Sequence, residues 1–262
     1  FILSKNNVLE MSRNGVSVLP GVPEAPIQET PALIHAQKIS DIENQKPLPN
    51  SPDVIKAVYF TGWSAGSEQK VDYLIDIAGK TEINAVVIDI KDFSGYVNYD
   101  IQNADVEKYK AKEIKISRIN ALIKKLHDAE IYVIARITVF QDPVLATARP
   151  NLAIHSKAKL NLTYVKNQGA QPSIPEVPEQ ELEKLRQRKP SEWLASTLWL
   201  DNKKLAWMDP ASKEVWDYNI AIAKDAASRG FDEINFDYIR FVSDGNLIDM
   251  VFPFWNGKTL KS

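Results

Sequence analysis

The feature that most constrains the fold of this chain is a repeated alternation of apolar runs with helical patterns. The runs are rich in β-branched residues and are almost free of charge until their last positions. Strands with this composition are typically parallel, with helices covering both faces of the sheet. The pattern predicts an α/β fold with strands in four runs, at residues 54–61, 83–90, 131–140 and 231–241.

Helical patterns separate the strands. After the first run, apolar residues recur at the i, i+3, i+4 and i+7 spacing, and Gly79 follows as a helix terminator. Before the fourth run, we expect Asp209 to cap a helix, Pro210 to lie in its first turn and Gly230 to end it. The expected buried faces are Val71, Leu74, Ile75 and Ala78, then Ile119, Leu122, Ile123 and Leu126, then Trp216, Ile220, Ala223 and Ala227.

The chain is predicted to have two parts. Residues 1–53 hold seven of the fifteen prolines and no periodic apolar pattern, which favours a disordered, extended tether. Residues 54–262 form the folded part, with a long insertion at about 141–208 that includes a short charged helix near residues 179–188. Typical connections between a strand and a helix have about 2–6 residues, so an insertion of this length is expected to build substrate-specific loops.

Composition excludes several classes of function. The net charge of −2 gives no reason to expect nucleic acid or an anionic membrane surface as a partner. The absence of cysteine excludes disulfides, thiolate metal sites and cysteine nucleophiles. Three scattered histidines and the lack of a phosphate-binding glycine motif predict neither a metal nor a cofactor. A structural Ca²⁺ on Asp142, Asp244 or Asp249 is an alternative, although loop carboxylates are usually only solvated.

Polar residues close the apolar runs at the ends where α/β enzymes place their chemistry. The second run closes with Asp89, Lys91 and Asp92, and the third with Arg136. In the fourth, Glu233, Asn235 and Asp237 share one face of the strand. Because an unpaired buried carboxylate costs several kcal/mol, this face must line a hydrated cleft or be paired with a cation such as Arg136 or Arg240. The alternative is an edge strand with one solvated face.

Three segments then resemble a known family. VVIDIKDFSGY at 86–96, YVIARITVFQDP at 132–143 and FDEINFDYIRFVSDG at 231–245 resemble bacterial glycoside hydrolase-like domains, which are (β/α)8 barrels of the TIM type distantly similar to α-amylase-like glycosidases. The resemblance runs from about residue 54 to the end of the sequence. It implies that the chain holds the first four βα units of such a barrel. It also implies that the carboxylate closing strand 4, Asp237, is the catalytic nucleophile, and that the proton donor follows strand 5, beyond Ser262.

One departure bears on the mechanism. Asn235 stands where the amylase pattern has an arginine, so the electrostatic partner of Asp237 is expected to differ, with Arg136 and Arg240 keeping it ionised. Asp89 is the other candidate catalytic carboxylate; its alternative role is a salt bridge to Arg136 or Lys91. The residues expected to bind substrate are Tyr59, Trp63, Lys91, Asp92, Arg136, Trp207, Asn235 and Arg240, with Tyr59, Trp63 and Trp207 as platforms for sugar rings.

The sequence is compatible with two other functions. A barrel that has lost its acid would bind carbohydrate without catalysis. Gly62-Trp63-Ser64-Ala65-Gly66 also matches the nucleophile elbow of serine esterases, with His127 and His155 as the downstream histidines. The alternative for Ser64 is a simple helix cap at a glycine-rich strand exit.

The sequence thus predicts an O-glycosyl hydrolase acting on a polysaccharide or oligosaccharide. The Pro-rich segment favours an extracytoplasmic protein, secreted or associated with the cell envelope. Phe1, Ile2 and Leu3, without an initiating Met, fit either the stub of a removed signal or membrane tether upstream of residue 1, or a sequence that starts mid-protein. No run approaches the ~18 apolar residues that a membrane span requires.

Overall fold

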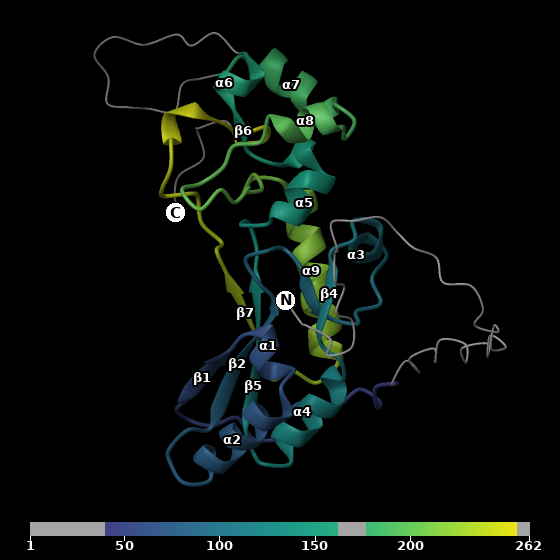
Figure 1. Ribbon diagram of the computed structural model, residues 1–262, viewed down its shortest axis with the longest axis vertical. Coiled ribbons are helices and arrows are strands. Elements are labelled where there is room, and N and C mark those ends of the chain that lie inside the picture. Colours follow the sequence, from purple (N-terminus) through teal and green to yellow (C-terminus); the bar gives the residue numbers. More distant parts are fainter. Residues whose placement is uncertain (1–39, 162–176, 256–262) are drawn as a thin grey trace, which may run out of the picture. The chain divides into compact units, whose positions relative to one another are not determined.

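The computed structural model describes residues 40–161 and 177–255. It has an α/β fold built on a mainly parallel sheet (Figure 1). The four predicted strands are all present, as β1 (Ala57–Phe60), β2 (Ala85–Lys91), β5 (Tyr132–Thr138) and β7 (Glu233–Asp237). They pair in chain order, β1 with β2, β2 with β5 and β5 with β7, and every pair is parallel.

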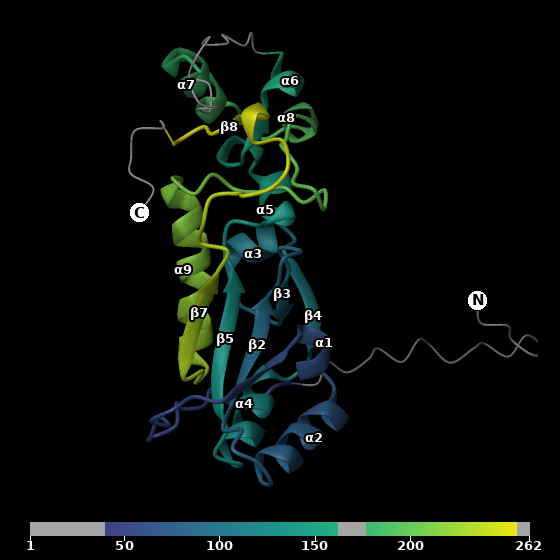
Figure 2. The same cartoon turned by 90° about the vertical axis from the view of Figure 1, so that its left-hand side faces the viewer.

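Helices cover one face of this sheet. The predicted helices correspond to α2 (Glu68–Ala78), α4 (Ile119–His127) and α9 (Lys213–Ser228). Figure 2 shows α9 running alongside β5 and β7. Alternate strand residues such as Ile88, Ala135 and Ile137 are fully buried against these helices. We call this the helix-packed face.

The opposite face is apolar only near the amino ends of the strands. There Ala85, Tyr132 and Ile134 form a small apolar cluster, against which Leu48 packs from the segment before β1. Toward the carboxyl ends the same face carries polar side chains. We call this the open face.

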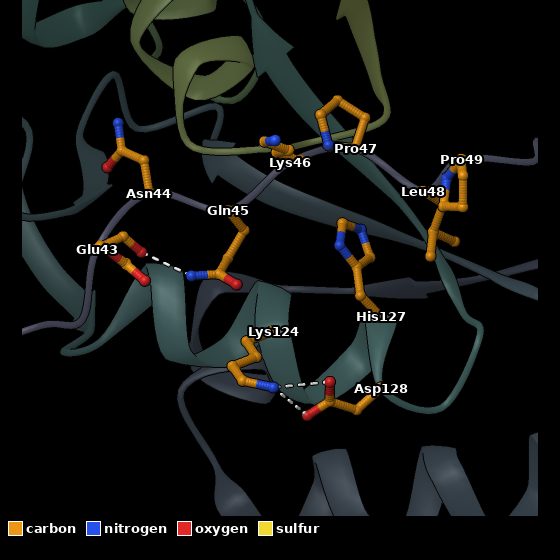
Figure 3. A pocket seen from close by; sticks show the side chains of 10 residues that line it. All are labelled: Glu43, Asn44, Gln45, Lys46, Pro47, Leu48, Pro49, Lys124, His127 and Asp128. Carbon is orange, nitrogen blue, oxygen red and sulfur yellow. Dashed lines mark hydrogen bonds and ion pairs between the residues drawn. The ribbon is translucent and has the colours of Figure 1, made fainter.

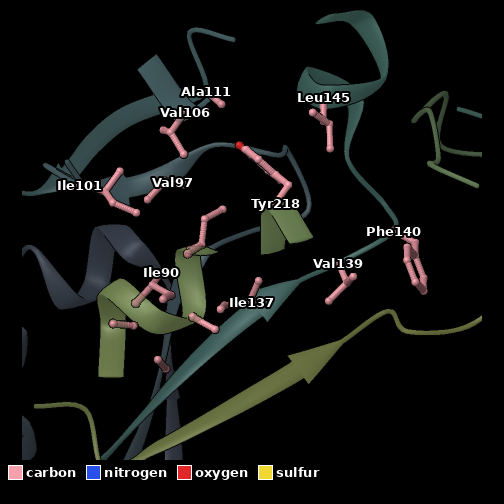
Figure 4. Packing of buried hydrophobic residues seen from close by; sticks show 14 of the residues in the cluster. Ile90, Val97, Ile101, Val106, Ala111, Ile137, Val139, Phe140, Leu145 and Tyr218 are labelled. Carbon is pink, nitrogen blue, oxygen red and sulfur yellow. The ribbon is translucent and has the colours of Figure 1, made fainter. Parts of the chain in front are cut away.

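An excursion after β2 was not predicted. The chain forms β3 (Val97–Tyr99), α3 (Ala104–Lys108) and β4 (Lys112–Ile116) before α4 begins. β3 pairs antiparallel with the end of β2, and β4 pairs parallel with β3. Figure 4 shows how Val97, Val106 and Ala111 of this excursion pack with Tyr218 of α9 and extend the main core. Three-residue strands and a five-residue helix are too short to give a clear apolar period.

The insertion at 141–208 is a series of short elements. They are α5 (Pro143–Ala148), η1 (Pro150–Leu152), β6 (His155–Ser156), α6 (Lys157–Leu160), α7 (Glu179–Gln187) and α8 (Glu192–Ser196). The predicted charged helix is α7. After β7, η2 (Leu247–Asp249) leads into β8 (Met250–Val251), which pairs with β6. The insertion and the segment after β7 therefore pack together.

Three expectations about α9 were wrong. Asp209 does not cap the helix: its buried carboxylate accepts backbone hydrogen bonds from Ala211, Phe254 and Trp255, and α9 begins later, after Ser212. Pro210 therefore lies before the helix and not in its first turn. The buried face is also rotated from the predicted one. Trp216 and Ile220 are each 43% exposed and Ala227 is exposed, whereas Ala223 is buried as expected. The actual buried face is Val215, Tyr218, Asn219, Ile222, Ala223 and Ala226. Gly230, at φ +99°, follows the helix end as predicted.

Residues 1–39 of the predicted tether lie outside the described residues. Residues 40–53 lack helix and strand, yet part of them is bound to the fold. The carboxylate of Asp41 accepts the backbone N–H groups of Asn120 and Ala121 at the start of α4, and Gln45 N donates to Arg229 O. Figure 3 shows the segment 43–49 crossing α4 near His127. The segment and α4 together line an open pocket of about 400 Å³. No described helix is long and apolar enough to span a membrane.

Asp232 joins this segment to the sheet. Its Oδ1 accepts the backbone N–H of Leu48 at 2.6 Å, and its Oδ2 accepts that of Val133 at 2.6 Å. His127 Nε2 lies 3.0 Å from the same Oδ2, and the Asp232 side chain is only 2% exposed. One carboxylate thus holds three parts of the chain.

We expect Asp232→Ala to lower the free energy of unfolding by about 2–4 kcal/mol, because two backbone donors lose their acceptor. Urea unfolding followed by circular dichroism measures this. Asp128→Ala is the control, since Asp128 forms an exposed i,i+4 pair with Lys124; its loss should cost less than about 1 kcal/mol. Equal effects of the two variants would contradict this role for Asp232.

Candidate active site

Four predicted site residues meet at the carboxyl ends of the parallel strands, on the open face. Tyr59 comes from β1, Asp89 from β2, Arg136 from β5 and Asp237 from β7. Strand pairing aligns them, because Asp89 is the register partner of Arg136, and Arg136 of Asn235. We call Tyr59, Asp89, Arg136 and Asp237 the carboxylate cluster.

Arg136 lies between the two carboxylates. Its Nη1 donates to Asp89 Oδ1 at 2.5 Å, while its Nε and Nη2 donate to Asp237 Oδ2 at 2.9 and 2.7 Å. Tyr59 OH donates to the other oxygen of Asp89, and the Arg136 guanidinium lies 5.7 Å from the Tyr59 ring centroid. The predicted pairing of Asp237 with Arg136 is therefore present, and so is the alternative salt bridge of Asp89 with Arg136.

The environments of the two carboxylates push their pKa values apart. Partial burial would raise the pKa of Asp237, but the hydrogen bonds from Arg136 and the Tyr238 backbone, with the charges of Arg136 and Arg240, lower it below the usual 3.8. Deeper burial raises the pKa of Asp89 above the same value, despite hydrogen bonds from Tyr59 and Arg136. Burial and the bond to Asp89 raise the pKa of Tyr59 to about 12.

Access to the two carboxylates also differs. The Asp237 side chain is 46% exposed, whereas that of Asp89 is 3% exposed and both its oxygens are bound. Asp237 can therefore approach a ligand directly, and Asp89 acts on the cluster mainly through Arg136.

Tyr238 is a member of the site that the sequence did not indicate. Its backbone φ of +55° is unusual for a bulky residue and ends β7 immediately after Asp237. Its N–H donates to Asp237 Oδ1 at 2.6 Å, and its ring centroid lies 5.8 Å from that of Trp207. Nothing in the alternating pattern of the run signals this change of backbone conformation.

The structure does not bring Lys91 to the cluster. A register shift between Asp89 and Lys91 pairs Lys91 with Ile137, so it points to the helix-packed face. There it is fully buried, 2.7 Å from Asp142 Oδ2, and donates to Thr138 O at 2.6 Å. Strict alternation would have placed it beside Asp89, which is why the sequence was misleading.

Trp207 is also displaced from its expected role as a platform for sugar rings. It is 2% exposed, and its indole N–H donates to Asp201 Oδ2 at 3.0 Å. The indole packs against Tyr238 and Arg240, and the Arg240 guanidinium lies 5.4 Å from the ring centroid of Trp207.

The remaining predicted residues lie beside the cluster. Asp92 pairs at 2.8 Å with Lys115 of β4, and this lysine lies 5.8 Å from the ring centroid of Trp63. Trp63 is 66% exposed and Tyr59 is 54% exposed, so both rings are accessible. Asn235 is exposed on the open face.

Asp237 does not line either of two pockets formed by the described residues. One pocket is the cavity beside α4, and the other, of about 500 Å³, lies between Tyr96, Tyr109 and Val144. The carboxylate cluster instead lies on the open face of the sheet, where β7 has β5 as its one partner among the described strands.

The serine esterase arrangement is not assembled among the described residues. Ser64 Oγ accepts from Thr61 Oγ1 at 3.2 Å and from Lys70 Nζ at 3.4 Å. His127 contacts Asp232, and buried His155 contacts Thr197 and Pro150, with its pKa lowered by burial to about 4.

Of the candidate calcium ligands, Asp142 pairs with Lys91, and Asp249 accepts the Ala158 N–H.

We predict that Lys91 is structural. Lys91→Met leaves the buried Asp142 without its cation and should lower the free energy of unfolding by about 3–5 kcal/mol. Adding Asp142→Asn should recover most of this, since the amide oxygen can still accept the Leu145 N–H that caps α5. Urea unfolding checks both variants, and a mild effect of Lys91→Met alone would contradict the assignment.

The electrostatics of the cluster give a second prediction. A ¹³C carboxyl titration by NMR should find Asp89 titrating above pH 3.8 and Asp237 below it. Arg136→Gln should raise the pKa of Asp237, because the cation that favours its ionised form is gone. A lowered Asp237 pKa stabilises the fold above pH 3.8, and this contribution is lost as the pH falls through the folded value. An unchanged Asp237 pKa in Arg136→Gln would refute this pairing.

Comparison with known proteins gives the chain its family. A profile of the family described as "Putative glycosyl hydrolase domain" matches residues 57–173 and 180–261. A hypothetical protein of known structure from Ruminiclostridium thermocellum ATCC 27405 is 35% identical over 78% of this chain and 84% of that chain, with a TM-score of 0.58. Comparison with curated proteins finds no match.

Two glycosidases are more remote. Alpha-L-fucosidase isoenzyme 2 from Paenibacillus thiaminolyticus is 14% identical over 70% of this chain and 23% of the enzyme, with a TM-score of 0.39. A maltogenic alpha-amylase from Thermotoga neapolitana is 12% identical over 71% of this chain and 40% of the enzyme, with a TM-score of 0.37. The chain spans less than half of either enzyme, and neither likeness is close enough to assign an activity. The family match covers most of the sequence, and the chain belongs to the family described as "Putative glycosyl hydrolase domain".

Proposed function

We propose that this protein hydrolyses glycosidic bonds in a polysaccharide or oligosaccharide, with Asp237 as its catalytic carboxylate. The observation that carries the proposal is the carboxylate cluster, in which Arg136 holds an accessible and an inaccessible carboxylate at the carboxyl ends of parallel strands. Membership of a family described as a glycosyl hydrolase domain supports a carbohydrate substrate.

Asp237 suits the role of nucleophile or stabiliser of an oxocarbenium-like transition state. Its pKa is lowered, so it is ionised at neutral pH. Its Oδ2 is held by two donors of Arg136, while Oδ1 accepts only the Tyr238 N–H among the described residues, which leaves a lone pair for the anomeric carbon. A general acid needs the opposite, a carboxyl that remains protonated.

Asp89 has a raised pKa but is not placed as that acid. A proton on Asp89 cannot reach a glycosidic oxygen while Arg136 and Tyr59 occupy both of its oxygens. We assign Asp89 as a positioning residue that orients Arg136. Tyr59, Trp63, Asp92 and Asn235 are proposed to contact substrate, since they lie on or beside the open face.

The proton donor is proposed to come from a strand outside the described residues that pairs with the free edge of β7. This follows from the sheet, because β1 and β7 each have one strand partner among the described strands and their open faces are partly exposed. Unpaired parallel edges of this kind are closed in a TIM-type (β/α)8 barrel, of which β1, β2, β5 and β7 would be the first four strands. Closing the barrel would also turn the open face into the wall of a cleft.

A non-catalytic carbohydrate-binding protein is the second candidate. It is favoured by one observation: Asp89 and Asp92, the other predicted carboxylates in and beside the cluster, are both engaged by other side chains. The test below separates the two.

The prediction is that Asp237→Asn reduces hydrolysis by about 10³-fold or more while leaving substrate binding within a few-fold, because an amide cannot attack or carry the charge. Release of reducing sugar from a panel of polysaccharides and of nitrophenol from aryl glycosides measures the activity. Asp244→Asn, an exposed loop position, is the matched control and should be fully active. Binding without any hydrolysis by the wild type would favour the second candidate.

We also propose an extracytoplasmic location, tethered or secreted, on the basis of the Pro-rich segment at 20–52. The proposal is tested by immunodetection in fractionated cells. Recovery of the protein in the cytosolic fraction would contradict it.

A further inference from the structure

Arg240 is a cation of the site that has no carboxylate partner within residues 40–161 and 177–255. Its guanidinium lies 5.4 Å from the ring centroid of Trp207 and 5.5 Å from that of Tyr238. Its Nη1 donates to Ser243 Oγ at 2.8 Å and to Phe241 O at 3.2 Å. These contacts are all to neutral groups. They restrain the guanidinium and leave its charge without a direct carboxylate contact.

The contrast with Arg136 defines what Arg240 can do. Arg136 uses Nε, Nη1 and Nη2 on two carboxylates, so it has little capacity for a ligand. Arg240 uses Nη1 alone among the described residues, which leaves the Nε and Nη2 edge unoccupied. That edge presents two parallel N–H donors, the geometry that matches the two oxygens of an oxyanion.

The arginine is also preorganised for binding. A guanidinium that packs against two aromatic rings and donates two hydrogen bonds has already lost part of its rotational freedom, so less is lost when a ligand binds. Trp207 beneath it is buried and is itself held by Asp201. Arg240 is itself exposed.

Its position links it to the catalytic carboxylate. The guanidinium groups of Arg136 and Arg240 both lie within 6.0 Å of the ring centroid of Tyr238, and Tyr238 directly follows Asp237. The charge of Arg240 also acts on Asp237, so the two side chains border one site, and an oxyanion on Arg240 can belong to the same saccharide.

We propose that Arg240 binds a carboxylate of the saccharide, so that the site takes a polysaccharide containing uronic acid in preference to a neutral one. The proposal rests on the proposed function for the position of the site, but it concerns recognition and can be measured without any hydrolysis. The loop of the insertion that carries Trp207 is then a determinant of specificity, because it supports the arginine.

Affinity electrophoresis tests this with polygalacturonate, alginate and hyaluronan, each beside its carboxyl-reduced neutral form, and with dextran sulfate as a sulfate ester. We expect the wild type to be retarded by at least one uronic acid polymer and not by its reduced form. Arg240→Gln should weaken that binding about 10-fold or more, as for the loss of a bidentate charged contact. Arg240→Lys keeps the positive charge but lacks the paired N–H donors of the guanidinium, so it should retain only part of the wild-type affinity.

The control variant is Lys224→Gln, which removes the same charge from an exposed position of α9. It should leave binding unchanged, and circular dichroism should show that all variants are folded. Three outcomes would overturn the proposal: no retardation by any uronic acid polymer, retardation by dextran sulfate alone, or equal losses in Arg240→Gln and Lys224→Gln. Binding and hydrolysis are measured separately, so a wild type that binds the acidic polymer without cleaving it would contradict the proposed function alone, whereas the three outcomes above contradict this proposal alone.

Discussion

The candidate active site depends on one guanidinium shared by two carboxylates. Arg136 joins β2 to β7 across β5, and it is 17% exposed while Asp89 beneath it is 3% exposed. Ionic groups this far from water are stabilised only if they are paired and hydrogen bonded, and the cluster meets both conditions. The same pairing produces the asymmetry of the site, with one carboxylate accessible and of lowered pKa and the other enclosed and of raised pKa.

The support for this cluster comes from parts of the chain far apart in sequence. The insertion supplies buried Trp207, which packs beneath Tyr238 and Arg240, and the excursion after β2 supplies Lys115, which pairs with Asp92. At the amino ends of the strands, the Asp232 carboxylate contacts the segment before β1, the start of β5 and His127 of α4. The carboxyl ends of the strands therefore carry polar and aromatic side chains, while the amino ends are covered by apolar packing and backbone hydrogen bonds.

The parallel strands and the pairing of Asp237 with Arg136 could be predicted because they follow from the alternation of side chains along each run. The errors arose where the backbone leaves that regular pattern. A register shift turns Lys91 to the buried side, the left-handed conformation of Tyr238 ends β7 early, and Ser212 rather than Asp209 precedes α9. Trp207 was misassigned because an indole that supports a site and one that contacts a sugar have the same sequence signature.

The central claim is that Arg136 keeps Asp237 ionised for catalysis, and the pH dependence of kcat/KM tests it most directly. Its acid limb reports the essential carboxylate of the free enzyme. In the wild type this limb should lie below pH 3.8, and in Arg136→Gln it should move to higher pH, with a lower plateau. An acid limb at the same pH in both proteins would contradict the account, because the catalytic group would then not be held by Arg136.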